Sequence, residues 1–441
     1  GRPVHVEGRY LMRSGESLVA MNIDQIQSIL SEAGPDYSAE ICREATWDDL
    51  DTECIEEFRR RWIKKSGNAA LKDVNRVQLL ADAELAFGEQ MTYAALILFG
   101  KRLSLGRLLG QAEVIFEYRA NDLTGPAQQR VEFRQGFFSF YDKLWDLIEL
   151  RNTVQHYQDG LFIWDIKTFN EGAIREAILN AVSHRDYRSG ESAFVRQYPE
   201  RIEISSPGGF PVGVTVENIL WKQNPRNRRV ADILAKCGLV ERSGQGMNRI
   251  FESCIRESKG DPDFRNTDKW NVCLTLHGTI QQPEFLRVLE KIGDERLRSF
   301  STEDFIVIQA VYTGTVLSDR LEPVARKLLE EGLIEKVPHS KDNPWILARK
   351  LFSAIGKAGV HTRKVGLDRE THKALLQAHI KKTSQQGSPL KELRQVVPYL
   401  DRGAVQTLLR ELREEEKIHS HGNTNAGLWY PGPMTEGCHR E

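Results

Sequence analysis

The chain has 441 residues, of which 40% are hydrophobic and 28% are charged, and its formal net charge is −1. This length exceeds what one hydrophobic core supports and predicts about three domains of an ordinary globular protein. The balanced charge excludes a polybasic nucleic-acid-binding chain, so any such contact must come from local patches. No apolar stretch reaches the ~18 residues of a membrane span, and no secretory signal is visible. The six cysteines form no Cys-x-x-Cys pair, which argues against structural zinc or a disulfide framework and favours a cytoplasmic setting.

Residues 1–20 are predicted to form an isolated hairpin with glycines at its turns. The expected strands are Val4–Val6, Tyr10–Arg13 and Ser17–Val19. Because a hairpin alone is only marginally stable, residues 1–32 are interpreted as the end of a longer domain.

Residues 33–111 are predicted to be a mostly helical connecting segment. A helix over Cys54–Trp62 carries the start of a basic run; such a run is usually a solvated face, and contact with nucleic acid is the alternative. The apolar segment Tyr93–Phe99 fits a buried strand or a buried helix equally well. Further on, we expect a strand over Ala112–Tyr118 and a long helix over Phe133–Leu150. The aromatic residues of that helix indicate a core or a dimer seam, and we expect a homodimer.

Residues 171–187 carry the most informative pattern. Ile174, Ile178 and Val182, together with intervening alanines, recur at helical spacing and predict one buried stripe. Glu176 and Asn180 are four residues apart, so both side chains leave one face of this helix. A carboxylate can polarise a water for attack on a γ-phosphate, and an amide oxygen can hold Mg²⁺ beside it. Taken alone, the pair is equally compatible with a solvated helix face.

Two glycine-containing turns follow this helix. A strand with alternating isoleucines ends in Gly208 and Gly209, and adjacent glycines allow a sharp turn and close approach to a ligand. Gly244 and Gly246 then precede a helical pattern. The start of a helix is a ready anion site because of its free N–H groups and its dipole. Together with the flanking strands, these elements predict one domain over residues 112–280.

Two further groups of elements follow. At residues 295–350, two helices and a strand suggest a winged-helix-like domain. At residues 367–431, three helices and two short strands predict a second such domain with a β-wing. The helices expected there are Thr371–Lys382, Leu390–Val397 and one capped by Asp401 that runs to Glu415.

The last of these helices carries the candidate DNA contact. Four polar residues form an outward stripe on it: Arg402, Gln406, Arg410 and Arg413. Arg and Gln read guanine and adenine edges in a major groove, and Arg also binds phosphate. The alternative is a solvated charged face, which the glutamates that follow Arg410 favour.

Taken together, these motifs resemble the ATPase superfamily of gyrase, chaperones, histidine kinases and MutL, also called the Bergerat fold. The amino-acid sequences of the motifs are most similar to those of one branch, which is found in bacterial transcriptional regulators labelled as relatives of a RecG-like helicase. The matching segments are Arg175–Ala181, His184–Tyr187, Ser206–Gly209, Asn224–Arg228 and Ser243–Gly246. In those regulators a Schlafen-like DNA-binding domain precedes the ATPase, and residues 1–32 resemble its last hairpin and helix. Residues 367–431 resemble their C-terminal winged helix.

The resemblance implies roles for particular residues. Asn180 would coordinate Mg²⁺, Glu176 would orient the attacking water as the catalytic residue, and Asp186 would assist the site. The backbones of the four turn glycines would hold the base and phosphates of ATP. The chain departs from the superfamily at the strand-end Asp that pairs with the adenine amino group, because Ser205 or Ser206 stands there. This substitution leaves open a degenerate site that binds nucleotide without hydrolysing it.

These features predict an α+β protein in which a Bergerat-type α/β sandwich is flanked by a helical segment and winged-helix domains. The expected function is ATP- and Mg²⁺-dependent binding to double-stranded DNA, as in transcriptional regulation, with or without weak ATP hydrolysis. The alternative is a non-catalytic DNA-binding or scaffold protein. No Gly-x-x-x-x-Gly-Lys-Ser/Thr loop is present, so helicase activity is not expected.

Overall fold

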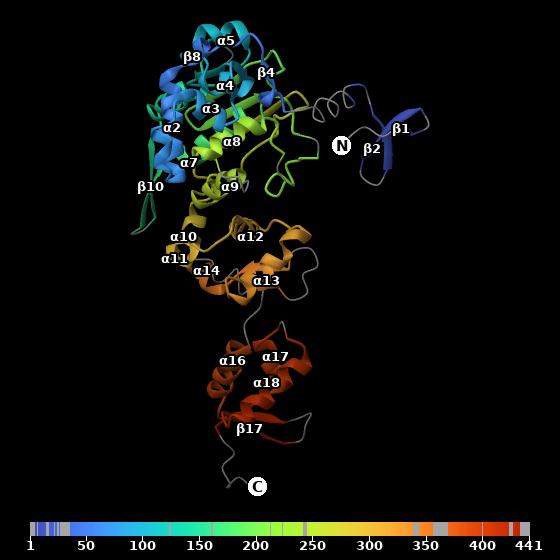
Figure 1. The fold of residues 1–441 in the computed structure, drawn as a ribbon. Coiled ribbons are helices and arrows are strands. Elements are labelled where there is room, and N and C mark those ends of the chain that lie inside the picture. Colours follow the sequence, from blue (N-terminus) through green and yellow to red (C-terminus); the bar gives the residue numbers. More distant parts are fainter. Residues whose placement is uncertain are drawn as a thin grey trace. The chain divides into compact units, whose positions relative to one another are not determined.

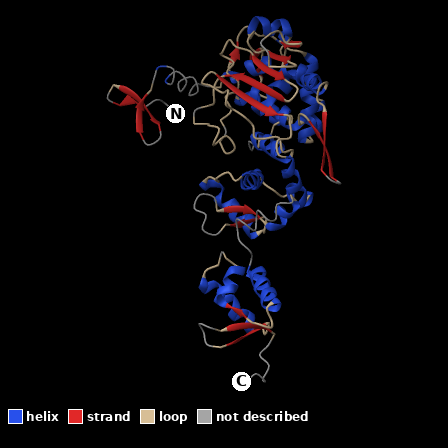
Figure 2. Cartoon of the chain, turned by 180° about the vertical axis from the view of Figure 1, so that it is seen from behind, coloured by secondary structure: helices blue, strands red, loops and turns tan. Residues whose placement is uncertain are grey.

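In the computed structural model the described residues form both helices and strands (Figure 1). This mixture of helix and sheet confirms the predicted α+β class (Figure 2). By its contacts the chain divides into two compact units, Gly1–Leu289 with Glu295–Ile306 and Glu290–Asp294 with Val307–Glu441. The structure describes residues 5–6, 8–14, 17–21, 23, 26, 36–122, 125–159, 162–211, 213–222, 224–240, 245–337, 344–355, 369–398, 400–422 and 427–432. In these ranges no helix combines the length and apolar character needed to cross a bilayer.

The first residues form a small antiparallel sheet. Its strands are β1 (His5–Val6), β2 (Arg9–Ser14) and β3 (Ser17–Ala20), in the order β1-β2-β3. Gly8 has a φ of +81° between the first two strands, a conformation that glycine adopts at little cost. The predicted hairpin is confirmed; Gly15, at the second predicted turn, lies outside the described residues.

Residues 36–111 are mainly helical and also contain a small sheet that the sequence did not predict. The elements are η1 (Tyr37–Ala39), β4 (Ile41–Cys42), η2 (Trp47–Asp49), α2 (Thr52–Ser66), η3 (Ala69–Lys72), α3 (Arg76–Asp82), β5 (Ala86–Phe87), β6 (Gln90–Thr92), α4 (Tyr93–Phe99) and α5 (Arg102–Leu108). Strands β4, β6 and β5 pair antiparallel in that order. The apolar segment that fitted strand and helix alike is helix α4. It begins after Thr92, whose hydroxyl accepts a hydrogen bond from the Ala95 backbone N–H at 3.3 Å.

The arginines of the basic run on α2 are engaged within the protein. Arg59 is buried and donates to the carbonyl oxygens of Leu71 and Val74. The next two arginines of the run form ion pairs with Glu57. Arg59 also pairs with Glu56 at 2.9 Å, so each of the three guanidinium groups has a carboxylate partner on the same helix.

A five-stranded sheet forms the centre of the first unit. Its strands are β7 (Val114–Tyr118), β8 (Gln129–Phe133), β11 (Ala193–Gln197), β12 (Arg201–Pro207) and β13 (Asn271–His277), in the order β13-β12-β11-β7-β8. Only the β11–β7 pair among them is parallel. Val195, Ile202 and Ile204 point into the core as their alternation predicts. On the opposite face Glu117 is buried and pairs with Arg130 at 2.7 Å.

Helices α6 (Phe137–Glu149), α7 (Glu171–His184) and α9 (Gly246–Arg256) pack with this sheet. Helix α6 is shorter than the helix predicted over Phe133–Leu150, because Phe133 pairs with Val114 in the sheet and is therefore extended. Gly136 then brings the chain against the backbone of Phe99, where a Cβ would lie 2.6 Å from the Phe99 Cα. The long-helix prediction is corrected at its N-terminal end.

One hydrophobic core joins residues 36–111 to the sheet. Phe58 and Phe99 from the first segment contact Phe138 of α6, with ring centroids 6.2 and 5.5 Å apart. The same cluster continues to Ile202 and Leu274 in the sheet. The aromatic run of α6 is therefore core, the first of its two interpretations. The homodimer stays a prediction.

The remaining elements of the first unit lie around this centre. They are the hairpin β9 (Val154–Asp159) with β10 (Phe162–Lys167), helix α8 (Arg228–Lys236), helix α10 (Pro283–Ile292), which runs on into the second unit, and helix α11 (Asp294–Leu297), which begins in it. The β9–β10 hairpin was not predicted from the sequence. Its strands mix aromatic and charged residues and lack the strict alternation that marks a half-buried strand.

Helix α12 (Thr302–Thr313) begins in the first unit and ends in the second. It is followed by η4 (Asp319–Leu321), α13 (Glu322–Glu330), β14 (Ile334–Lys336), β15 (Trp345–Leu347) and α14 (Arg349–Ala354). The two helices and the strand predicted in this region are present, and β14 pairs antiparallel with β15.

The C-terminal elements follow the order helix, strand, helix, helix, strand, strand. They are α16 (Arg369–Lys382), β16 (Ser388–Pro389), α17 (Leu390–Val396), α18 (Arg402–Glu414), β17 (Ile418–His421) and β18 (Leu428–Pro431), with sheet order β16-β18-β17. All three predicted helices and both strands are present within a residue or two. Their core contains Leu376, Leu393, Val405 and Leu409.

Candidate functional site

Helix α7 begins and ends at identifiable contacts. At its start, the Asn170 side chain accepts a hydrogen bond from the Ala173 backbone N–H at 3.0 Å, and Glu171 follows in the first turn. The predicted apolar stripe is buried, with Ile174 and Ile178 each 1% exposed. The apolar side of α7 therefore packs in the core, and the polar residues Glu176 and Asn180 line the cavity described below.

The segment just before α8 clamps the C-terminal end of α7. Asn227 donates through its side chain to the carbonyl oxygens of Ser183 and Arg185, at 3.0 and 2.7 Å. Arg226 donates to the carbonyl oxygens of His184 and Gly209. The last carbonyls of a helix lack partners within it, so these bonds satisfy them and tie α7 to the glycine turn. The sequence signal for this clamp was the Asn224–Arg228 segment, to which no role was given.

The glycine turn after β12 is closely packed. Gly208 has a φ of +94°, and a Cβ there would lie 2.0 Å from an Arg226 guanidinium nitrogen and 2.8 Å from the Asp186 Cβ. At Gly209 a Cβ would lie 2.7 Å from the Lys269 carbonyl oxygen. Both positions therefore require glycine. Asp186 lies behind this turn, and its backbone N–H donates to the Pro207 carbonyl oxygen at 2.8 Å.

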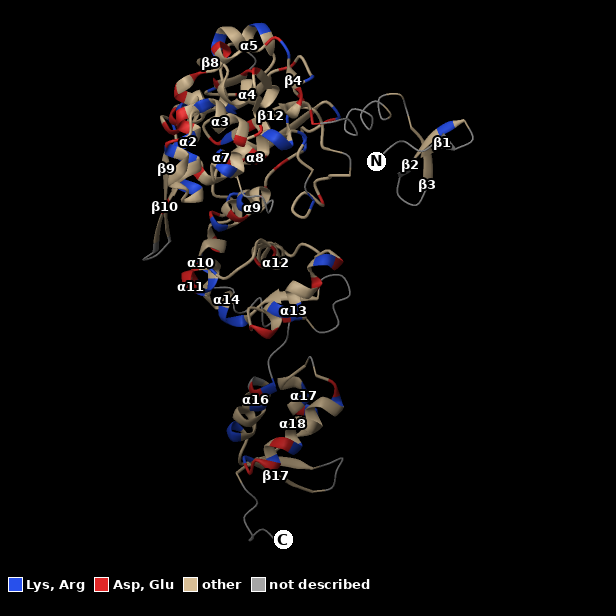
Figure 3. Cartoon of the chain, viewed as in Figure 1, with Lys and Arg blue, Asp and Glu red and all other residues tan. Residues whose placement is uncertain are grey.

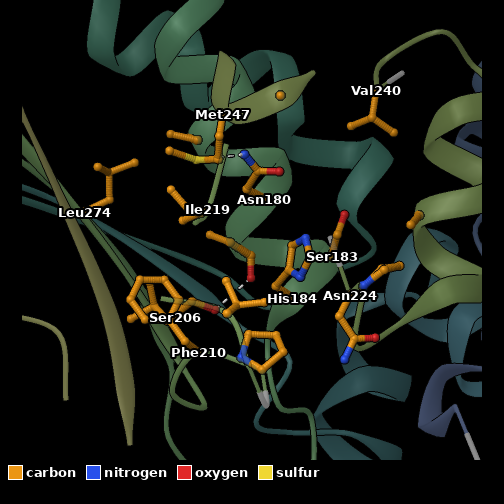
Figure 4. A pocket seen from close by; sticks show the side chains of 18 of the residues that line it. Asn180, Ser183, His184, Ser206, Phe210, Ile219, Asn224, Val240, Met247 and Leu274 are labelled. Carbon is orange, nitrogen blue, oxygen red and sulfur yellow. Dashed lines mark hydrogen bonds between the residues drawn. The ribbon is translucent and has the colours of Figure 1, made fainter. Parts of the chain in front are cut away.

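A cavity of about 360 Å³ lies between α7, the glycine turn, α8 and the start of α9 (Figure 4). Five of the predicted site residues line it: Glu176, Asn180, Gly208, Gly209 and Gly246. Asp186 is not among the lining residues. The first glycine of the second turn, Gly244, lies outside the described residues.

Glu176, Asn180 and the start of α9 meet at one end of the cavity. A Cβ on Gly246 would lie 2.1 Å from Glu176 Oε1 and 3.4 Å from Asn180 Nδ2, so the α9 backbone rests on both side chains. Glu176 is 5% exposed. Asn180 Nδ2 also donates to Met247 Sδ at 3.9 Å, shown as a dashed line in Figure 4. A carboxylate, an amide and a positive helix end are thereby brought together.

The opposite end of the cavity is apolar, with one hydroxyl. Phe210 lies there beside Ser206 (Figure 4), and Ile204 and Leu274 add to the apolar lining. The Ser206 hydroxyl donates to the Ala181 carbonyl oxygen at 2.7 Å. Because its proton is engaged, this hydroxyl presents only acceptor lone pairs to the cavity.

His184 stands between the two ends and was not predicted as a site residue. Burial and the nearby Arg226 charge lower the pKa of its ring to about 4. The ring is therefore neutral near pH 7. On one side of it in Figure 4 lie Ser206 and Phe210, and on the other lies Asn224.

The donor set suits Mg²⁺ that is held jointly with phosphates. Mg²⁺ is bound by one or two protein oxygens together with substrate phosphates, rather than by an all-protein cage. The Asn180 amide oxygen supplies such an oxygen at one end of the cavity, with the Glu176 carboxylate beside it. Among the described residues no group of three or more His, Cys, Asp or Glu side chains forms a cage. The residues present thus fit a nucleotide-borne magnesium ion.

Helix α18 presents the four residues of the predicted stripe to solvent, while Val405, Leu408, Leu409 and Leu412 face the core. Asp401 caps its start by accepting from the Ala404 backbone N–H at 2.7 Å. Two of the nearby glutamates pair with α16: Glu411 with Arg369, and Glu415, just after the helix, with Lys373. Figure 3 shows that basic and acidic positions are both scattered along the described ribbon, and the formal net charge of the chain is −1.

Comparison with known proteins identifies two parts of the chain. Residues 190–276 match a family described as "Putative ATP-dependent DNA helicase recG C-terminal". Residues 27–115 match a domain family of unknown function. No curated protein matches the chain. The first match covers both glycine turns and begins after α7, so the Glu176–Asn180 helix lies outside it.

A solved structure shares the fold. The match is to the crystal structure of the DIP2311 protein from Corynebacterium diphtheriae, with a TM-score of 0.60 and 21% sequence identity. It covers 79% of this chain and 72% of the DIP2311 chain. This likeness shows a shared fold. The family match relates the segment 190–276 to RecG-like ATPase domains, and an ATPase-like domain suggests nucleotide binding.

Proposed function

We propose that this protein is a nucleotide-dependent DNA-binding protein, with ATP and Mg²⁺ bound in the cavity beside α7. The observation that carries the proposal is the convergence of Glu176, Asn180 and the Gly246 backbone at one end of the cavity. They come from two helices that are separated by more than sixty residues of sequence. The alternative interpretation of Glu176 and Asn180 is a solvated helix face. On such a face the Glu176 carboxylate would not be 5% exposed and packed against a second helix.

The two ends of the cavity suit the two ends of a nucleotide. The apolar end, between Ile204, Phe210 and Leu274, offers walls for a flat base, and the Ser206 hydroxyl offers an acceptor for an amino group. The start of α9 favours negative charge, as phosphate requires. Asn180 would hold Mg²⁺ through its amide oxygen. Glu176 would orient a water toward the terminal phosphate.

The second candidate function is a regulator or scaffold that binds nucleotide without hydrolysing it. Ser206 favours it, because a neutral hydroxyl with an engaged proton is a weaker partner for an amino group than a carboxylate. Both functions share the cavity and differ only in turnover.

DNA binding is assigned to the C-terminal elements. The order helix, strand, helix, helix, strand, strand is that of a winged helix, in which the third helix enters a groove. Helix α18 has that place and carries the exposed stripe Arg402, Gln406, Arg410 and Arg413. A nucleotide site and a DNA-reading helix on one chain fit transcriptional regulation.

Calorimetric titration of the full chain with ATP, with and without Mg²⁺, tests the nucleotide part. We expect saturable binding that weakens when Mg²⁺ is removed. Absence of binding under both conditions would overturn the proposal. Phosphate release measured on the same sample, with and without duplex DNA, then separates an ATPase from a regulator that only binds nucleotide.

A further inference from the structure

Arg228 is a cation that lacks compensation at the start of α8. It lines the cavity and is exposed, and within the described part of the chain its guanidinium has no hydrogen-bond or ion-pair partner. A positive side chain in the first turn of a helix opposes the helix dipole. The adjacent Arg229 also lies in the first turn of α8, but its charge is balanced by an ion pair with Glu84. Its backbone N–H donates to Asp36. Arg228 thus brings a positive charge to a cavity wall that also includes Lys222 and Asp232.

The same helix end has no side-chain cap from the residue before it. Asn227, at the N-cap position, uses its side-chain amide to clamp the carbonyl oxygens of Ser183 and Arg185. The start of this nine-residue helix is capped by Asp36 instead, whose carboxylate accepts from the Arg229 backbone N–H at 2.8 Å. The phosphate-binding groups that remain on this side of the cavity are therefore side chains.

Ser183 supplies a second, independent observation. Its side chain lines the cavity and is 4% exposed, and its hydroxyl oxygen has no hydrogen-bond partner. A buried hydroxyl without a partner is costly, and a ligand oxygen would satisfy it. The Asn227 backbone N–H donates to the Ser183 carbonyl oxygen at 3.2 Å, so Ser183 adjoins the start of α8. In Figure 4 it lies on the side of Asn224 and Val240, away from Ser206 and Phe210.

We propose that the side chains of Ser183 and Arg228 form a second phosphate subsite, distinct from the one at Glu176, Asn180 and Gly246. It rests on the proposed function and deepens it, because the phosphate it binds belongs to the same nucleotide. Arg binds phosphate with two parallel hydrogen bonds, and the serine hydroxyl donates a third. On α7, Ser183 follows Asn180 by three residues, about 4.5 Å along the helix axis. Neighbouring phosphates of one polyphosphate chain can reach both.

The test compares adenosine, AMP, ADP and ATP by calorimetry in the presence of Mg²⁺. We expect Arg228→Ala to weaken ATP binding tenfold or more and to change adenosine binding less than twofold. Arg228→Lys keeps the positive charge but lacks the two parallel N–H donors of the guanidinium, so it should lose an intermediate amount of ATP affinity. Ser183→Ala should weaken ATP binding severalfold, again with adenosine spared.

Lys236→Ala is the matched control. It removes one positive charge from the other end of α8, where the ammonium group lies 4.8 Å from the centre of the Trp62 ring. This variant should bind ATP like the wild type. In nucleotide-free protein, Arg228→Ala should also raise the melting temperature, because it removes an uncompensated charge; a residue kept for structure would give the reverse.

Two outcomes would overturn the subsite. One is wild-type ATP affinity in both Arg228→Ala and Ser183→Ala. The other is an equal loss of adenosine and ATP affinity in Arg228→Ala, which would make its effect a general distortion. If the wild type bound no nucleotide at all, the proposed function itself would fail, and that result is distinguishable from the first two.

Discussion

In the cavity, Glu176 is 5% exposed and rests against the backbone of Gly246, whereas on α18 the side chains of Arg402 and Arg410 lie in solvent. The cavity depends on contacts between segments that are distant in sequence. The outer face of α18 depends only on helix periodicity and on glutamates that pair with α16. A buried charge interacts strongly and tolerates little displacement, while an exposed charge is weak and screened by salt. Substitutions should therefore act sharply in the cavity and gradually on α18.

Turnover is the most sensitive property of the cavity. Glu176→Ala should retain ATP binding and lose ~10²–10⁴-fold in hydrolysis rate, because a positioned general base typically contributes that much. The measurement is phosphate release at saturating ATP. Glu171→Ala, on the exposed first turn of the same helix, is the control and should hydrolyse normally. Wild-type protein that releases no phosphate, even with DNA, would leave only the regulator that binds without hydrolysis.

The close approach at Gly246 predicts a large loss from one methyl group. A Cβ there would lie 2.1 Å from Glu176 Oε1, so Gly246→Ala must displace α9 or the carboxylate and should weaken ATP binding more than tenfold. Gly190→Ala is the control, since nothing lies within 4 Å of a Cβ at that position. Equal ATP affinities in a calorimetric titration of the two variants would show that α9 is not part of the site.

Asn180→Ala should weaken Mg²⁺-dependent ATP binding about tenfold, or about 1.4 kcal/mol, because the variant lacks the amide oxygen assigned to the metal. Calorimetry without Mg²⁺ supplies the internal control: there the variant and the wild type should bind alike. A loss of the same size in both conditions would contradict the metal assignment.

On α18 the expected effect is smaller and depends on salt. Replacing Arg402 and Arg410 with Ala should weaken binding to duplex DNA. It should also lower the slope of log affinity against log salt by roughly 0.9 for each DNA phosphate that the variant no longer neutralises. Anisotropy titrations at several salt concentrations measure both quantities. Replacing Lys381 and Lys382, exposed at the end of α16, removes the same charge elsewhere and should have less effect. An unchanged slope in the Arg variant would make the stripe a solvated face.

The last expected effect concerns the stability of the fold rather than binding, and it depends on His184 and pH. Its folded-state pKa of about 4 lies below the ordinary value of 6.5, so the unfolded chain takes up this proton first as pH falls. The stability it contributes is present above pH 6.5 and is lost between pH 6.5 and about 4, on the order of 1–3 kcal/mol. His184→Gln should flatten the dependence of melting temperature on pH in this window. His156→Gln, at an exposed position, should not.

The comparison of cavity and helix also shows what the sequence could reveal. Helix α18 and its inward leucines follow from periodicity and an Asp cap, which are local signals, and they were predicted within a residue. In the cavity, Glu176, Asn180 and Gly246 were recognisable as motifs. Ser183 lies outside those motifs, and His184 and Arg228 lie in matching segments without having been given a role, because their places around the cavity depend on the clamp formed by Arg226 and Asn227. The β-hairpin at residues 154–167 was not predicted because apolar and polar residues do not alternate strictly along its strands.

The core that joins residues 36–111 to the sheet has a consequence for how the protein folds. Two family models recognise residues 27–115 and 190–276 separately, yet Phe58 and Phe99 lie in the same apolar cluster as Ile202 and Leu274. Segments that bury one another's surface lose their order together. The first unit should therefore unfold in a single cooperative transition, and a chain cut at residue 111 would leave two halves with exposed aromatic faces. Recognisable modules and independent folding units need not have the same boundaries.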